Sequence, residues 1–92
     1  MATTHYLKTW PQFFEAVERG DKNFEVRKDD RAYQTGDTLI LHRFDPKAHP
    51  NEQWNKPDIE RRVTFVLRGG EFGIEPGYVV MGLVKPESTD EA

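Results

Sequence analysis

The 92-residue sequence contains no cysteine. Disulfide bonds, thiolate nucleophiles and zinc sites with sulfur ligands are therefore excluded. Basic residues are not in surplus either, because 13 Lys and Arg stand against 16 Asp and Glu, and this balance does not favour binding to duplex nucleic acid through phosphates alone. No segment approaches the roughly 18 consecutive apolar residues of a membrane span. We therefore expect a soluble, cytoplasmic protein without a membrane partner.

The sequence is short and polar, with 36% hydrophobic residues and a mean hydropathy of -0.80. This length predicts one small domain, which we place at residues 1–85, followed by an acidic, disordered tail at residues 86–92. Three acidic residues lie in that tail, and without them the two signs of charge are balanced: Glu87, Asp90 and Glu91. A local cluster of basic side chains can therefore still form a binding groove.

One helix is predicted from about residue 10 to residue 19. Thr9 is placed to be its N-cap and Gln12 to complete a capping box. Pro11 suits the first turn, and Gly20 suits a left-handed end. The apolar residues of this segment form one stripe that we expect to cover a sheet: Trp10, Phe13, Phe14 and Val17.

Five other segments show the period-two alternation or the β-branched and aromatic content of strands. In the fourth of them, Val63, Phe65 and Leu67 are predicted to share one face. Composition and periodicity together predict a β-rich domain with a covering helix. The five predicted strands are residues 6–8, 23–27, 38–44, 59–67 and 78–84.

Residues 20–27 read G-x-K-x-x-E-x-R, directly after the predicted helix and at the beginning of a strand. This segment resembles the ASCH domain, a branch of the PUA-like superfamily of small pseudobarrels. The similarity extends over residues 5–84 and is greatest to compact phage and bacterial proteins. It implies an α+β fold, a small β-barrel of five to six strands with one principal helix at about residues 10–19 between the first two strands. Three further segments carry it: His5-Tyr6-Leu7-Lys8, Thr35-Gly36-Asp37 and Gly77 to Gly82.

The charged residues of this motif are the main candidates for a site. In an extended strand, Glu25 and Arg27 point to the same face about 7 Å apart, and Gly20 leaves Lys22 free to aim its amine toward them. Such a trio can bind an anionic or polar planar ligand, or it can be a surface ion pair beside a solvated lysine. The resemblance implies that these residues line a cleft for RNA or a nucleotide-like ligand. The predicted ligand-binding residues are Lys8, Lys22, Glu25, Arg27 and Tyr78.

Other side chains have two interpretations each. Lys8 is a cleft residue or an ordinary edge-strand lysine. Lys28 and Arg31 extend a phosphate-contacting rim or belong to a solvated turn. Trp54 and Tyr78 offer stacking surfaces for an unpaired base, or they anchor a loop and the barrel mouth. His42 and His49, with Asp45 between them, match no established metal-binding pattern and lack a third firm ligand, so we predict no metal site. We also predict no cofactor.

Three functions follow as hypotheses. The first is an RNA- or nucleotide-binding module that holds single-stranded RNA or a modified nucleoside. The second is a small hydrolase of the ASCH type, either a metal-independent ribonuclease with Lys22 and Glu25 as acid and base, or a nucleoside amidohydrolase. The amidohydrolase branch has threonine where this chain has Glu25, so the expected hydroxyl is missing. The third is a phage protein that contacts a host protein through residues 45–57, with no partner specified.

Overall fold

The computed structural model describes residues 2–50 and 56–86, so the predictions for Trp54 and for the tail after residue 86 lie outside the described residues. The elements confirm the five predicted strands and the predicted helix, each within a few residues. They are β1 (Thr4–Thr9), α1 (Pro11–Glu18), β2 (Phe24–Lys28), β3 (Thr38–Arg43), β4 (Ile59–Arg68) and β5 (Tyr78–Val84).

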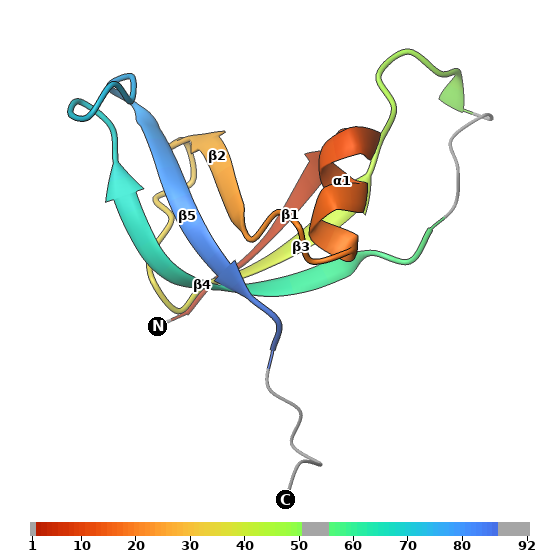
Figure 1. Ribbon diagram of the computed structural model, residues 1–92, viewed down its shortest axis with the longest axis horizontal. Coiled ribbons are helices and arrows are strands. Elements are labelled where there is room, and N and C mark those ends of the chain that lie inside the picture. The colour runs from red at the N-terminus through yellow and green to blue at the C-terminus, as the bar shows by residue number, and fades with distance from the viewer. Residues whose placement is uncertain (1, 51–55, 87–92) are drawn as a thin grey trace, which may run out of the picture.

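The strands form one mixed sheet in the order β1-β3-β4-β5-β2. β1 and β3 run parallel, and the other neighbours run antiparallel. Figure 1 shows the sheet strongly curled along the long strand β4, with α1 beside β1 and β3. The fold is therefore α+β, a half-barrel with one short helix between the first two strands, as the sequence predicted.

The two edge strands, β1 and β2, are bridged by arginine side chains in the part of the chain that the structure describes. Arg27 Nη2 donates hydrogen bonds to the Lys8 carbonyl at 2.9 Å and to Thr9 Oγ1 at 3.2 Å. Arg31 Nη1 donates to the Tyr6 carbonyl at 3.1 Å. These contacts hold the open edges of the half-barrel near each other without a continuous backbone ladder.

The helix begins differently from the prediction. Trp10 is the N-cap, in an extended conformation and without a side-chain cap, so the predicted Thr9 cap and the capping box with Gln12 are wrong. Thr9 is instead the last residue of β1, and its hydroxyl is buried. Pro11 does occupy the first turn, and Gly20 follows the helix at φ +89°. No helix within residues 2–50 and 56–86 is long and apolar enough to cross a membrane.

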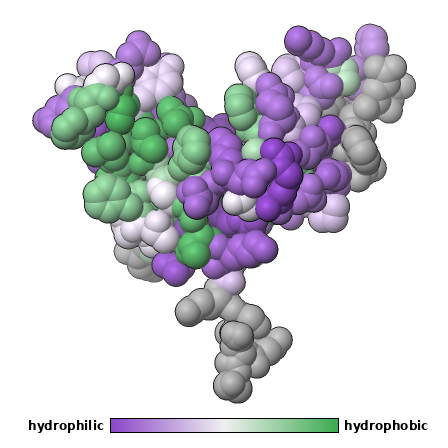
Figure 2. Space-filling view, in the orientation of Figure 1, coloured by the Kyte–Doolittle hydropathy of each residue, from purple (hydrophilic) through white to green (hydrophobic). Residues whose placement is uncertain are grey.

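The core lies between the concave face of the sheet and α1. The helix contributes Phe14 and Val17, which are fully buried, and this confirms its predicted covering role. Hydrophobic residues also gather on the outside, over the half of the molecule formed by β2, β4 and β5, whereas the half that carries α1 is hydrophilic (Figure 2). The buried apolar side chains are Leu7, Phe14, Val17, Tyr33, Leu39, Leu41, Val63, Val79, Met81 and Leu83.

A β-bulge in β4 changes which residues face the core. Val63 pairs with Leu83 and Phe65 pairs with Gly82, so one extra residue lies between them. Val63 is buried, but Phe65 is largely exposed, and Val66 takes over the core side. The prediction that Val63, Phe65 and Leu67 share a face is therefore wrong, because the inserted residue reverses the alternation.

Asp37 is a buried carboxylate with three hydrogen-bond donors around it. Its side chain accepts hydrogen bonds from the backbone N–H of Thr3 at 3.0 Å and of Gln34 at 2.9 Å. His5 Nε2 lies 2.8 Å from Oδ2, and the His5 ring packs edge-on against buried Tyr33, with 4.7 Å between ring centroids. This cluster ties the beginning of β1 to the beginning of β3.

Replacing Gly69 with alanine is expected to destabilise the β4–β5 turn. A Cβ atom at this position would lie 1.8 Å from the Glu75 carbonyl oxygen and 2.9 Å from the Tyr78 carbonyl oxygen. Both neighbours are backbone atoms, so the turn must move, and we expect a loss of about 2 kcal/mol in the free energy of unfolding. Urea denaturation would measure it. The same change at Gly70, where nothing lies within 4 Å but φ is +104°, tests strain without a clash. A Gly69→Ala variant as stable as the unmodified protein would contradict this packing.

Candidate functional site

An open groove with a volume of about 580 Å³ lies between the end of β1, the beginning of α1 and β2. Four of the five predicted binding residues line it: Lys8, Lys22, Glu25 and Arg27. Tyr78 does not line it, since it lies opposite Lys28 at the far end of the β2–β5 pair. The other lining residues are Thr9, Trp10, Phe13, Asp21, Phe24 and Val26.

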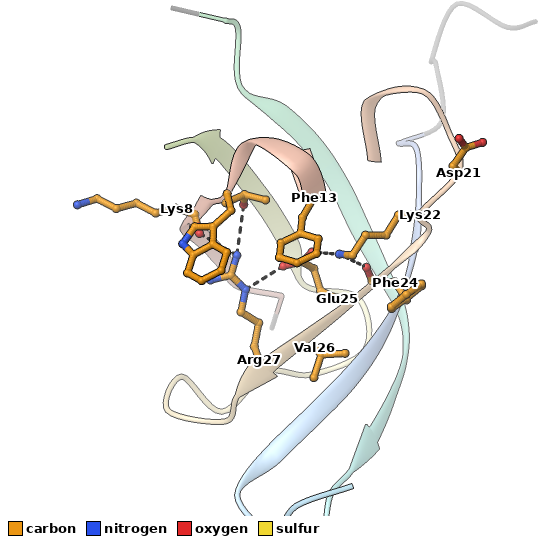
Figure 3. Close-up of a pocket in the computed structure, with 10 residues that line it drawn as sticks. Lys8, Phe13, Asp21, Lys22, Phe24, Glu25, Val26 and Arg27 are labelled. Carbon is orange, nitrogen blue, oxygen red and sulfur yellow. Dashed lines mark hydrogen bonds and ion pairs between the residues drawn. The ribbon is translucent and has the colours of Figure 1, made fainter. Parts of the chain in front are cut away.

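Glu25 is the central charged residue of the groove and is only 3% exposed. Its Oε1 accepts a hydrogen bond from Lys22 Nζ at 2.5 Å, and its Oε2 accepts one from Arg27 Nε at 2.8 Å. Figure 3 shows Lys22 and Arg27 reaching this carboxylate from opposite sides. Lys22 is therefore not a solvated lysine, and Glu25–Arg27 is more than a surface ion pair.

Local backbone structure explains this convergence. β2 is extended, so Glu25 and Arg27 project to the same side of the strand. After Gly20, the backbone N–H groups of Asp21 and Lys22 both donate to the Ala16 carbonyl, at 2.9 and 3.0 Å. These bonds hold the connector against the end of α1. The Lys22 amine therefore faces the strand that follows.

Aromatic rings flank the charged trio, and the sequence did not predict this. Phe13 is 44% exposed and Phe24 is 43% exposed. The Lys22 amine lies between them, 5.6 Å from the Phe13 ring centroid and 5.0 Å from the Phe24 ring centroid (Figure 3). Trp10 is half exposed and stacks on Phe13, with 6.1 Å between ring centroids.

The predicted helix stripe is therefore wrong for Trp10 and Phe13, which face the groove and not the core. The eight-residue helix buries only its Phe14 and Val17 side. The exposure of the Phe24 ring did have a sequence signal, because Phe24 alternates with Glu25 along β2. If the carboxylate points inward, the phenyl ring on the opposite side of the strand is left exposed.

The remaining candidates lie at the border of the groove or away from it. The Lys8 ammonium lies 4.6 Å from the centroid of the Phe44 ring, and in Figure 3 it extends away from the trio. Lys28 and Arg31 are not among the described residues that line the groove. His42 Nδ1 lies 2.9 Å from a carboxylate oxygen of Asp58, on an exposed part of the surface.

Comparison with known proteins shows the family to which this chain belongs. A model described as a domain of unknown function, DUF3850, matches residues 4–83, from the first residue of β1 to the last but one of β5. The chain belongs to the DUF3850 family. This DUF3850 chain is also 48% identical over 44 residues to an uncharacterized 12.9 kDa protein in the GpA 3′ region of Escherichia phage P2. The match covers 48% of this chain and 40% of the phage protein, so it spans less than half of that relative.

Proposed function

We propose that this DUF3850 domain is an RNA- or nucleotide-binding module that holds an unpaired base of single-stranded RNA, or a modified nucleoside, in the groove. One observation carries the proposal, namely the ion-paired trio Lys22, Glu25 and Arg27 set between exposed aromatic rings. Unpaired bases are bound by stacking on aromatic side chains and by polar contacts to their edges. The groove offers both kinds of contact in one place.

The charge of the groove supports a phosphate-bearing ligand. Three cations line it, Lys8, Lys22 and Arg27, against two carboxylates. One of those carboxylates, Asp21, is engaged by Arg19 Nε at 2.8 Å, and the other is neutralised within the trio. The groove is therefore locally basic although the chain has a net charge of -3.

We also propose that the domain is of the PUA-like, ASCH type. Two features support this relationship. The curled five-stranded sheet has its helix between the first two strands. The G-x-K-x-x-E-x-R segment contributes its lysine, glutamate and arginine to a single groove.

The hydrolase alternative has less support from the groove. Both oxygens of Glu25 already accept hydrogen bonds, and the expected hydroxyl at this position is absent. Thr9 is the hydroxyl-bearing residue among the described residues that line the groove. It is buried, and its Oγ1 interacts with Arg27 and the Leu7 carbonyl, so no general base is positioned to activate it.

Truncating an aromatic ring of the groove is expected to weaken RNA binding. Phe13→Ala and Phe24→Ala should each lower the affinity for a short single-stranded RNA about tenfold, because one stacked base contributes about 1–3 kcal/mol. Both rings are partly exposed, so the fold should survive. Phe72→Ala is the matched control, since Phe72 is 81% exposed and does not line the groove.

The measurement is an NMR titration of the labelled protein with a mixed-sequence RNA octamer and, separately, with cytidine and its acylated derivative. Chemical-shift changes centred on residues 8–10 and 22–27 support the groove as the site. Their absence at millimolar ligand would overturn the proposal and favour the protein-interaction hypothesis. If the RNA is cleaved or the acyl group is removed during the titration, the protein is a hydrolase and the proposal of a binding module is wrong.

A further inference from the structure

Glu25 is poorly placed to read the edge of a base in this groove, because its carboxylate is buried and paired with two cations of the protein. The carboxylate is almost fully buried, and each of its oxygens receives a charged donor. A base amino group would have to reach a buried anion past the side chains of Lys22 and Arg27. Glu25 is therefore a positioning residue that fixes the two cations.

The two cations keep donors that the protein does not use. Lys22 has three N–H donors, of which the structure shows one on Glu25 and one on the Phe24 carbonyl. Arg27 uses Nε on Glu25 and Nη2 on the end of β1, and its Nη1 has no protein acceptor among the described residues. Both side chains line the groove and are partly exposed. The charged trio therefore offers donors to a ligand.

We infer that this groove selects bases with carbonyl acceptors, such as uracil and guanine, over adenine; this inference rests on the proposed function. Uracil has two carbonyl oxygens, and guanine presents O6 and N7 side by side, so each base offers two acceptors to the donors that remain on Lys22 Nζ and Arg27 Nη1. Adenine has no carbonyl oxygen, and its acceptor nitrogen N7 lies beside the N6 amino group, which is itself a donor. When this edge of adenine faces Lys22 and Arg27, the amino group meets two cations, and the Glu25 carboxylate between them already accepts from both.

Stacking alone would give a different order of affinity. Adenine and guanine have rings of the same size, so the flanking Phe13 and Phe24 cannot distinguish them by contact area. Uracil is the smallest of the three bases and has the least area to stack. A preference for uracil over adenine must therefore arise from the donors.

The test compares the binding of UMP, GMP and AMP to the full chain by NMR titration, with the phosphate held constant. We expect UMP and GMP to bind at least about fivefold more tightly than AMP, because one good pair of base contacts discriminates by about that factor or more. An affinity for AMP equal to or above that for either of the others would overturn the inference. If RNA binds the groove while the three nucleotides bind equally, the proposed function stands and only the selectivity is lost.

Two arginine variants locate the source of the selectivity. Arg27→Lys keeps the positive charge but removes the free Nη1 donor, and it should reduce the preference for GMP over AMP to about twofold or less. Arg31→Lys is the control, because Arg31 also bridges to β1 yet does not line the groove. It should keep the preference of the unmodified protein. Retention of the full preference in Arg27→Lys, with a native NMR spectrum, would overturn the assigned role of Arg27.

Discussion

Replacing Asp37 with alanine should lower the free energy of unfolding by about 3 kcal/mol, since removal of one buried acceptor leaves three donors without it. Asp37 is 1% exposed. Its carboxylate accepts from the backbone of Thr3 and Gln34 and lies 2.8 Å from His5 Nε2. A carboxylate is an acceptor only, so Nε2 carries the hydrogen in this contact. Alanine leaves all three donors without this acceptor; the His5 contact is buried, and the hydrogen bonds from Thr3 and Gln34 are partly buried.

Urea denaturation at neutral pH measures this loss, and an exposed carboxylate supplies the matched control. Asp58 also pairs with a histidine, His42 at 2.9 Å, but both side chains are well exposed. Asp58→Ala should therefore change stability by less than about 1 kcal/mol. If the two alanine variants lose the same stability, the Asp37 cluster does not have the structural role that its burial indicates.

The contribution of Asp37 should also depend on pH. Burial alone would raise the pKa of Asp37, but the hydrogen bonds from His5, Thr3 and Gln34 outweigh it and hold the pKa below its ordinary value of 3.8. A group whose pKa is lowered by folding stabilises the protein above its unfolded-state pKa. That stability is lost as the pH falls from about 3.8 through the lower pKa of the folded state. The difference in stability between the unmodified protein and Asp37→Asn should therefore shrink over that acidic range.

The strands were predictable because each has a local signal, whereas their neighbours in the sheet were not. Short apolar, β-rich runs identified residues 38–44 and 78–84 as strands, and period-two alternation identified residues 59–67, without reference to the rest of the chain. The pairing of β1 with β3, and of β2 with β5, depends on contacts between distant segments. The sequence analysis therefore predicted a curled sheet but not the order of its strands. The bulge in β4 was equally invisible, since Thr64 looks like an ordinary polar position of a strand.

The candidate site was predictable where the chain itself brings the residues together. Lys22, Glu25 and Arg27 lie within six positions, so an extended strand after a glycine turn nearly dictates their meeting. Phe13 was missed because its spacing also suits a helix stripe that packs on the sheet. Asp37 was missed because Thr35-Gly36-Asp37 resembles a surface turn. In both cases burial is decided by tertiary packing, which one local pattern does not specify.

Replacing Lys22 with methionine should destabilise the protein by about 2–3 kcal/mol, because loss of one partner from a buried ion pair leaves charge uncompensated. Glu25 remains almost fully buried, with Arg27 as its remaining partner. Methionine keeps an aliphatic stem between Phe13 and Phe24, so lost packing contributes little. The comparison is Arg19→Met, which breaks the exposed Arg19–Asp21 pair and should change stability by less than about 1 kcal/mol.

The double variant Lys22→Met with Glu25→Gln separates the charge effect from the loss of a side chain. A neutral amide at position 25 leaves no buried anion without its partner, so part of the stability lost in Lys22→Met should return. The coupling energy between the two changes, measured by urea denaturation of all four proteins, should be about 1–2 kcal/mol. A coupling energy near zero would mean that the Lys22–Glu25 contact does not determine stability.

Because Glu25 also positions Arg27, both variants should lose RNA affinity even where the double variant regains stability. Stability and binding would then diverge, which is the behaviour expected of a charged trio whose buried carboxylate serves to hold two cations toward a ligand.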